Sequence, residues 1–130
     1  MKVHHIGYLV KNMERAIESF LMLGYAIESP TVRDDIRKIN ICFMINEATR
    51  VELIESVDSD SAVSGLITKM GVTPYHICYE VPSIAQEKEK LKASKYIMTA
   101  EPEKAPALGD RQVSFFYNKN IGLIELVEER

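Results

Sequence analysis

The sequence predicts an α+β fold in which two tandem βαβββ modules form a curved mixed sheet. The first observation is an internal repeat, because residues 76–96 repeat the pattern of residues 5–25 at a constant offset of 71 positions. Four pairs of landmarks keep this offset: His5 and His76, Tyr8 and Tyr79, Val10 and Val81, Tyr25 and Tyr96. The second observation is a later match between Val51-Glu52-Leu53 and Ile124-Glu125-Leu126 at an offset of 73, which indicates a small loop insertion. The third is that both halves show the same order of strand and helix patterns.

The elements of the first module follow from local patterns. Residues 3–10 are rich in apolar and β-branched residues, which is typical of a strand. Asn12 can cap a helix that starts at Met13, and Ala16, Phe20 and Leu23 fall at helical spacing on one face. We expect three shorter strands to follow, over about 25–30, 37–46 and 50–56.

The second module has matching elements. We expect a strand over 75–81, a helix capped by Ser83 with Ile84 and Leu91 on its buried face, and strands over about 96–100, 111–117 and 122–128. The segment from Glu101 to Asp110 is predicted as a surface loop, and residues 64–70 as a short helix in the joining segment. The 130 residues are therefore predicted to form one domain, with module one at about 1–57, a linker at about 58–73 and module two at about 74–130.

Composition excludes several classes of protein. The chain is 46% hydrophobic and 27% charged with a net charge of −3, so it can bury a core and has no basic block for nucleic acid. No apolar stretch has the roughly 20 residues that a membrane helix needs, and the polar, strand-like N-terminus does not resemble a signal peptide. Cys42 and Cys78 lie in apolar runs and are interpreted as buried, reduced thiols. We expect a cytoplasmic protein with no nucleic-acid or membrane partner.

The repeat also predicts a metal-binding cleft. Alternation along a strand puts His5 on one face of the first strand and His76 on the matching face of its counterpart. If a pseudo-twofold axis relates the modules, the two histidines converge, and so do Glu52 and Glu125. Two imidazoles and two carboxylates suit one divalent ion such as Ni²⁺, Zn²⁺ or Co²⁺, and two unpaired carboxylates in a cleft would otherwise repel.

Simpler interpretations exist for each residue taken alone. A single histidine in a strand is often structural, and a glutamate in an apolar strand usually marks its solvent face. Glu55 and Glu128 are expected to have such a solvent-face role or a strand-end role. The repeat favours a shared site, because both pairs recur together. Arg37, Asn40 and Arg111 are candidate substrate contacts, since a guanidinium recognises carboxylate or phosphate. The alternative for the two arginines is protection of a sheet edge.

These residues resemble a known family. The pattern of His5-Ile6-Gly7, Val51-Glu52-Leu53, His76-Ile77 and Gly122-Leu123-Ile124-Glu125-Leu126 resembles the vicinal oxygen chelate (glyoxalase/bleomycin resistance/dioxygenase) superfamily over residues 3–128. Within it, the chain looks most similar to small bacterial glyoxalase I-like proteins, and next to methylmalonyl-CoA epimerase. The resemblance implies a homodimer and a metal ion that chelates two neighbouring substrate oxygens, with Glu125 or Glu52 as the base.

The resemblance leaves three functions open. The first is a lyase of the glyoxalase I type that acts on the hemithioacetal of a 2-oxoaldehyde and a thiol. The second is an isomerase like methylmalonyl-CoA epimerase that acts on a CoA thioester, and the third is a non-catalytic small-molecule binding protein. Epimerases of this family usually carry a Gly-rich segment and a His-Pro-Lys-Ser-like turn before the last strand, which the stretch from Ala107–Arg111 through Tyr117–Asn120 matches poorly. Some epimerases also use an extra glutamate on the strand that precedes the second ligand, whereas this chain has no acidic residue from Arg37 to Ile45. We therefore expect the glyoxalase I type.

Overall fold

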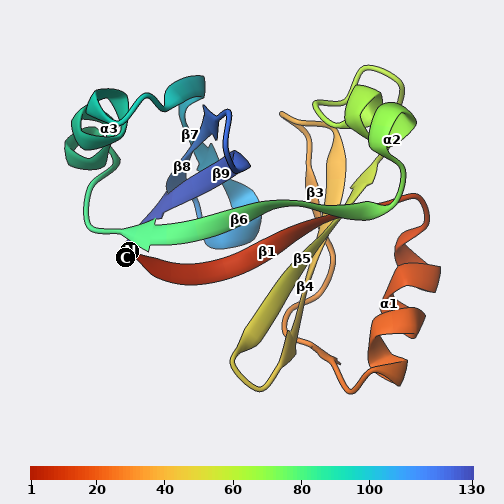
Figure 1. Cartoon of the computed structure of the whole chain (residues 1–130). Helices are drawn as coiled ribbons and strands as arrows, with labels where there is room; N and C mark the ends of the chain where they lie inside the picture. Colours follow the sequence, from red (N-terminus) through yellow and green to blue (C-terminus); the bar gives the residue numbers. More distant parts are fainter. The chain divides into compact units, whose positions relative to one another are not determined.

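The computed structural model describes residues 1–130 and confirms the α+β class (Figure 1). The chain forms nine strands, three α-helices and one 3₁₀ turn. Its residues group into two compact units, one of residues His5–Tyr75 and one of Met1–His4 together with His76–Arg130. None of the helices combines the length and the apolar composition that crossing a membrane requires.

The first unit contains the elements of the predicted first module and the linking helix. They are β1 (Lys2–Val10) from His5 onwards, α1 (Met13–Met22), β2 (Ala26–Ile27), β3 (Val32–Asp34), β4 (Ile39–Asn46), β5 (Thr49–Ser56) and α2 (Ser64–Met70). The strands are ordered β2-β4-β5-β1, with β3 also paired to β4. β1 and β5 are parallel, whereas β4 is antiparallel to β5, β2 and β3.

The strand predicted over 25–30 is the main difference in this unit. It is shortened to Ala26–Ile27, and the chain pairs with β4 again only from Val32. Pro30 lies in the interruption, and proline has no backbone N–H to donate to a neighbouring strand. The short helix expected over residues 64–70 is present as α2.

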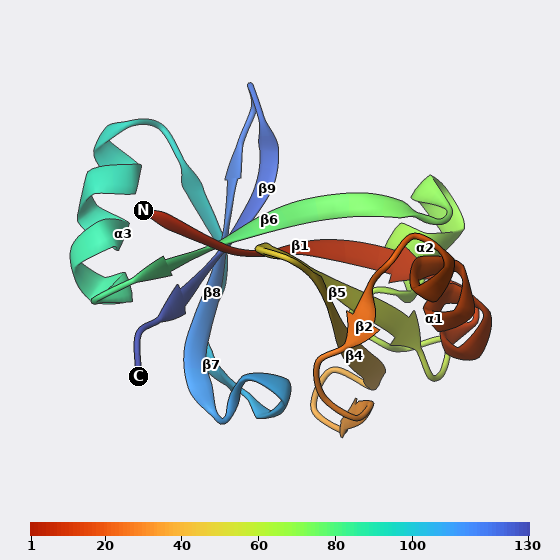
Figure 2. The same ribbon diagram turned by 90° about the horizontal axis from the view of Figure 1, so that it is seen from below.

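The second unit repeats this arrangement. It contains β6 (Thr73–Val81) from His76 onwards, α3 (Ile84–Ala93), β7 (Ile97–Ala105), the 3₁₀ turn Pro106–Leu108, β8 (Arg111–Asn118) and β9 (Gly122–Glu128). The strands are ordered β6-β9-β8-β7, and the pair β6 and β9 is parallel like β1 and β5. Both chain ends lie in this unit, on the side of α3 (Figure 2).

The prediction of a loop from Glu101 to Asp110 is wrong for its first half. β7 continues to Ala105 and stays paired with β8, but the register shifts between Ala100 and Glu103. Pro102 lies within that shift, and an irregularity at an outer strand is where a residue without a backbone donor can be accommodated.

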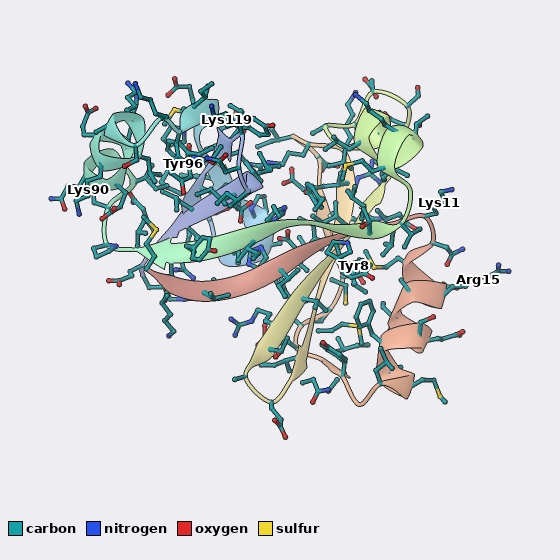
Figure 3. All side chains as sticks on the ribbon, viewed as in Figure 1. Tyr8, Lys11, Arg15, Lys90, Tyr96 and Lys119 are labelled. Carbon is teal, nitrogen blue, oxygen red and sulfur yellow. The ribbon has the colours of Figure 1, made fainter.

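Each unit buries one face of its strands against a helix. In the first unit α1 covers a cluster that includes Val10, Met44 and Leu53, and Tyr8 points from β1 towards α1 (Figure 3). Its ring lies edge-on to Phe20, with ring centres 5.3 Å apart. In the second unit α3 covers the matching cluster of Val81, Ile84, Leu91, Phe116, Ile124 and Leu126.

The first turns of α1 and α3 are stabilised by the capping residue before each helix and by a glutamate from another strand. Asn12 and Ser83 cap α1 and α3 as predicted, accepting hydrogen bonds from the backbone N–H groups of Arg15 and Gln86. Glu55 and Glu128 lie at the strand-end positions expected for them, are half-buried, and also bind the backbone of a helix. Glu55 Oε2 accepts a hydrogen bond from the N–H of Met13 at 2.7 Å, and Glu128 Oε1 accepts one from the N–H of Ile84 at 3.0 Å. The last strand of each module therefore holds the first turn of its helix.

Candidate functional site

The first unit places His5 and Glu52 together on neighbouring parallel strands. His5 lies on β1 and Glu52 on β5, and the distance between Nε2 of His5 and Oε1 of Glu52 is 3.4 Å. Phe43 on β4 is directly opposite Glu52, and its ring lies edge-on to the imidazole with centres 5.2 Å apart. Both polar side chains are buried, with His5 1% and Glu52 5% exposed.

The second unit contains the same group of three residues. His76 on β6 and Glu125 on β9 have their Nε2 and Oε2 atoms 4.0 Å apart. Phe115 on β8 is opposite Glu125, and its ring centre lies 5.4 Å from that of the imidazole, again edge-on. His76 is 4% and Glu125 5% exposed. We call each of these groups a half-site: His5, Glu52 and Phe43 in one unit, and His76, Glu125 and Phe115 in the other.

The half-sites lie on the face of each set of strands that the helix does not cover. In β4, Cys42 and Met44 contribute to the core under α1, so Phe43 between them projects to the opposite face. The phenylalanines were not among the predicted site residues. The sequence held only a partial signal, because Phe43 lies nine positions before Glu52 whereas Phe115 lies ten positions before Glu125.

The donor groups and their spacing fit a divalent ion. Each pair offers one imidazole nitrogen and one carboxylate, which are the donors such ions take from proteins. Two ligand atoms about 2.1 Å from the same ion, at an angle of about 90–110°, are themselves about 3.0–3.4 Å apart. The pair of His5 and Glu52, at 3.4 Å, matches this spacing, and the pair of His76 and Glu125, at 4.0 Å, is slightly wider. Both distances exceed the usual 2.7–3.2 Å of a hydrogen bond from nitrogen to oxygen.

The candidate substrate contacts are placed differently. Asn40 shares the α1 side of β4 with Cys42, and its Nδ2 donates to Oε1 of Glu55 at 3.0 Å. The structure therefore does not bring Asn40 together with His5 and Glu52, and its amide supports the helix cap. Arg37 lies in the turn before β4, where its Nη1 donates to Oδ2 of the buried Asp34 at 2.8 Å.

Arg111 begins β8 and shares the face of Phe115 by alternation along the strand. Its guanidinium donates to Oε2 of Glu80 and, through Nε, to the backbone carbonyl of Glu128 at 2.7 Å. The hydrogen bond from Arg111, followed by its charge, holds the pKa of Glu80 below its usual value, although burial acts in the opposite direction. Arg37 and Arg111 thus have structural partners, and their role as substrate contacts stays a prediction.

The chain was compared with protein families and with curated proteins. The model of the glyoxalase/bleomycin resistance protein/dioxygenase superfamily matches residues 4–115. The ethylmalonyl-CoA/methylmalonyl-CoA epimerase of Cereibacter sphaeroides is 24% identical over 131 residues, which covers 96% of each chain. The mitochondrial methylmalonyl-CoA epimerase of Mus musculus is 27% identical over 128 residues, which covers 96% of this chain and 71% of the mouse protein.

Solved structures show the same fold. A hypothetical protein from Bacillus halodurans matches 99% of this chain and 94% of its own, with a TM-score of 0.88 and 23% identity. The methylmalonyl-CoA epimerase of Mycobacterium tuberculosis matches 99% of this chain and 88% of its own, with a TM-score of 0.85 and 21% identity.

These findings correct the functional prediction. The expectation of a lyase of the glyoxalase I type is wrong, because the curated relatives are epimerases of CoA thioesters. The four candidate ligands could not distinguish a glyoxalase I reaction from an epimerase reaction, because both remove a proton next to a carbonyl group and need a metal ion and a base for it. The predicted family is confirmed by the extent of the match, which covers most of both modules. The chain belongs to the glyoxalase/bleomycin resistance protein/dioxygenase superfamily.

Proposed function

We propose that this protein is a metal-dependent isomerase that epimerises the carbon next to the thioester carbonyl of a CoA ester of the methylmalonyl type. The observation that carries the proposal is the pair of matched, buried half-sites, each with one imidazole and one carboxylate. The names of the curated relatives support the choice of substrate.

We infer that His5, Glu52, His76 and Glu125 together bind one divalent ion. A single half-site supplies two protein donors, whereas catalytic ions in proteins usually have at least three. Two glutamates also balance the charge of a divalent ion, and a buried carboxylate without a cation or strong donors is costly. Ni²⁺, Zn²⁺ and Co²⁺ all accept this donor set. The second half-site could come from the same chain or from a second copy, in line with the predicted homodimer.

The proposed epimerisation requires two acid–base groups. When bound, the ion supplies Lewis-acid stabilisation of the negative charge that develops on the thioester oxygen. One glutamate removes the hydrogen of the carbon between the two carbonyl groups, and the other returns a proton to its opposite face, so no atoms are gained or lost. Glu52 and Glu125 are the residues we assign to these roles. In the first unit, the side chains of β4 beside Glu52 are apolar, namely Ile41, Phe43 and Ile45, so no further base is available on that face of the strand.

The test starts with metal content. Purified wild-type protein should carry about one divalent ion per chain by elemental analysis, and His5→Ala and His76→Ala should each lose most of it. Glu47→Gln, which changes an exposed carboxylate in the turn after β4, is the control and should keep its metal.

Activity is then measured as exchange of the substrate hydrogen for deuterium in D₂O with methylmalonyl-CoA. Glu125→Gln and Glu52→Gln should each reduce epimerisation by about 10²-fold or more, because each loses an acid–base group. Turnover of methylglyoxal with glutathione is measured in parallel. Metal binding without exchange of any CoA thioester would refute the proposed reaction and leave a metal-binding protein without this activity.

A further inference from the structure

We propose that the second unit binds the CoA part of the substrate. An apolar row of three side chains, Leu123, Tyr117 and Ile97, contacts the pantetheine arm, and Lys95 and Lys119 bind the phosphates at its far end. The choice of CoA as the ligand rests on the proposed function, and the inference adds where this part of the substrate lies.

The apolar row lies on the same face of the strands as the half-site of this unit. Tyr117 on β8 is the direct partner of both Leu123 on β9 and Ile97 on β7. The neighbours of these residues in the sequence pack in the core cluster under α3; they are Phe116, Ile124 and Met98. Alternation along a strand therefore places the apolar row on the face that α3 does not cover, about 7 Å along the strands from the half-site.

The apolar row is accessible to a ligand. Ile97 is 64% and Tyr117 44% exposed, and Leu123 is half-buried. β7 is the outermost strand on this side of the sheet. A run of large apolar side chains that is exposed beside a candidate site indicates a surface that contacts a ligand or a partner.

Two lysines follow the apolar row at the same end of the strands. Lys95 lies two residues before Ile97, and Lys119 lies two residues after Tyr117, which is the partner of Ile97. Both lysines are exposed and neither is in an ion pair. The segments 90–100 and 111–124 contain no acidic residue. This end of the strands is therefore basic and favours an anionic group such as a phosphate.

The other end of the half-site is filled by an ion pair. Arg111 lies four residues before Phe115 on the same face of β8, and its side chain is 8% exposed. The guanidinium crosses β9 to donate to Glu80 on β6, on the same face. A thioester at the half-site therefore has its long substituent directed towards the end at which Tyr117 lies.

The first unit differs at the matching end of its strands. The turn between β4 and β5 begins with Glu47, whereas the turn between β8 and β9 begins with Lys119. Arg50 on β5 is neutralised by Glu28, with its Nε 2.8 Å from Oε1 of the glutamate. The first unit thus presents a carboxylate where the second presents a free cation, so an anionic ligand is favoured at the second unit.

The length of the pantetheine arm agrees with this arrangement. An extended strand advances about 3.4 Å per residue, so the four residues from Phe115 to Lys119 span about 14 Å. About thirteen bonds separate the thioester sulfur of a CoA ester from its first phosphorus atom, which is roughly 15 Å in an extended chain. An arm that starts at the half-site and lies along the apolar row therefore ends at the lysines.

Binding of propionyl-CoA tests the inference without the reaction, because this thioester has the CoA part but no carbon to epimerise. Its affinity for the metal-loaded protein is measured by isothermal titration calorimetry. Lys95→Ala and Lys119→Ala should each weaken binding about two- to fivefold, and the double variant about tenfold. The effect of the lysines should shrink in high salt, which screens exposed charges. Tyr117→Ser should weaken binding about fivefold at either salt concentration, because it removes apolar contact area.

A matched control removes the general effect of lost positive charge. Lys90 is an exposed lysine of the same unit, but it lies on α3, which covers the opposite face of the strands (Figure 3). Lys90→Ala should keep the affinity within about twofold of wild type. Equal weakening in Lys90→Ala and Lys119→Ala would overturn the inference, as would an unchanged affinity in the double lysine variant or no binding of propionyl-CoA to the wild type.

A second copy of the chain is the other occupant to be tested. Sedimentation velocity is measured for wild type and Ile97→Ser. If Ile97→Ser converts a dimer into a monomer and leaves the affinity for propionyl-CoA unchanged, the apolar row is an interface between copies and the inference is overturned. We expect the sedimentation of the two proteins to be the same.

A shortened substrate separates this inference from the proposed function. The methylmalonyl thioester of N-acetylcysteamine keeps the reacting carbon but has no phosphates. The double lysine variant should raise KM for methylmalonyl-CoA about tenfold with little change in kcat, and should leave kcat/KM for the short thioester within about twofold. An equal loss for both substrates would overturn the role of the lysines. If the wild type exchanges the hydrogen of neither substrate, the proposed reaction fails, and the binding of propionyl-CoA still tests the apolar row and the lysines.

Discussion

Replacing Glu55 by alanine should destabilise the protein more than the same replacement at any exposed glutamate, because the Glu55 carboxylate binds both the start of α1 and a side chain of β4. It accepts hydrogen bonds from the N–H of Met13 at 2.7 Å and from Nδ2 of Asn40 at 3.0 Å. Met13 begins α1 and is only 6% exposed, so water cannot readily replace the lost acceptor. A hydrogen bond to a charged group contributes about 1.5–3 kcal/mol, and a lost helix cap costs about 0.5–2 kcal/mol.

From these contacts we expect Glu55→Ala to lower the free energy of unfolding by about 2–3 kcal/mol. Glu128→Ala should cost less, about 1–2 kcal/mol, because Glu128 accepts from the N–H of Ile84 alone and the carbonyl that binds Arg111 is retained. Glu55→Gln keeps one acceptor oxygen and should lie between Glu55→Ala and wild type. For a chain of this size each kcal/mol lowers Tm by roughly 3–5 °C.

The assay is urea denaturation followed by far-ultraviolet circular dichroism, with the m value as a check that the unfolding transition is unchanged. Glu18→Ala, an exposed position in α1, is the control and should stay within about 0.5 kcal/mol of wild type. If Glu55→Ala also stays within that range, the carboxylate does not stabilise the start of the helix and the reasoning is refuted. If Glu128→Ala lowered the free energy of unfolding more than Glu55→Ala does, this would contradict the argument that Glu55 contributes more because it accepts two hydrogen bonds and Glu128 accepts one.

Three further outcomes follow from the structure. Arg111 lowers the pKa of Glu80, so the ion pair stabilises the folded state at neutral pH and loses this contribution as the pH falls through that lowered pKa. In urea titrations, Glu80→Gln should therefore lose less stability than wild type between pH 7 and about pH 3. Asn12→Ala removes the acceptor for the N–H of Arg15 and should cost about 1 kcal/mol, whereas Asn12→Ser should restore most of it in the same titration. Gly24 has a φ of 92°, so Gly24→Ala should lower Tm, by roughly 3–10 °C in calorimetry, and an unchanged Tm would contradict the strain argument.

Local patterns were sufficient to predict most elements, and the repeat singled out the two histidines and the two glutamates as candidate ligands. Asn12 and Ser83 indicated where α1 and α3 begin, because an N-cap acts on the N–H groups of the next turn of the same chain. The repeat identified the histidine and glutamate that meet in each half-site. It could do so because equivalent residues in two copies of a module occupy equivalent places on their strands.

The tertiary structure decided the contacts between residues far apart in the chain. The hydrogen bond between Glu55 and Met13 joins residues 42 positions apart, and that between Arg111 and Glu80 joins residues 31 positions apart. No local periodicity indicates such a partner. Asn40 is a second example. Its neighbours in the sequence predicted a strand, but only the packing of that strand against α1 decided on which side of the sheet the Asn40 side chain lies. The sequence alone therefore indicated the histidine and the glutamate of each half-site but not its phenylalanine. The packing of strand against strand decided what surrounds each carboxylate, because neighbouring strands, not neighbouring residues, supply those side chains.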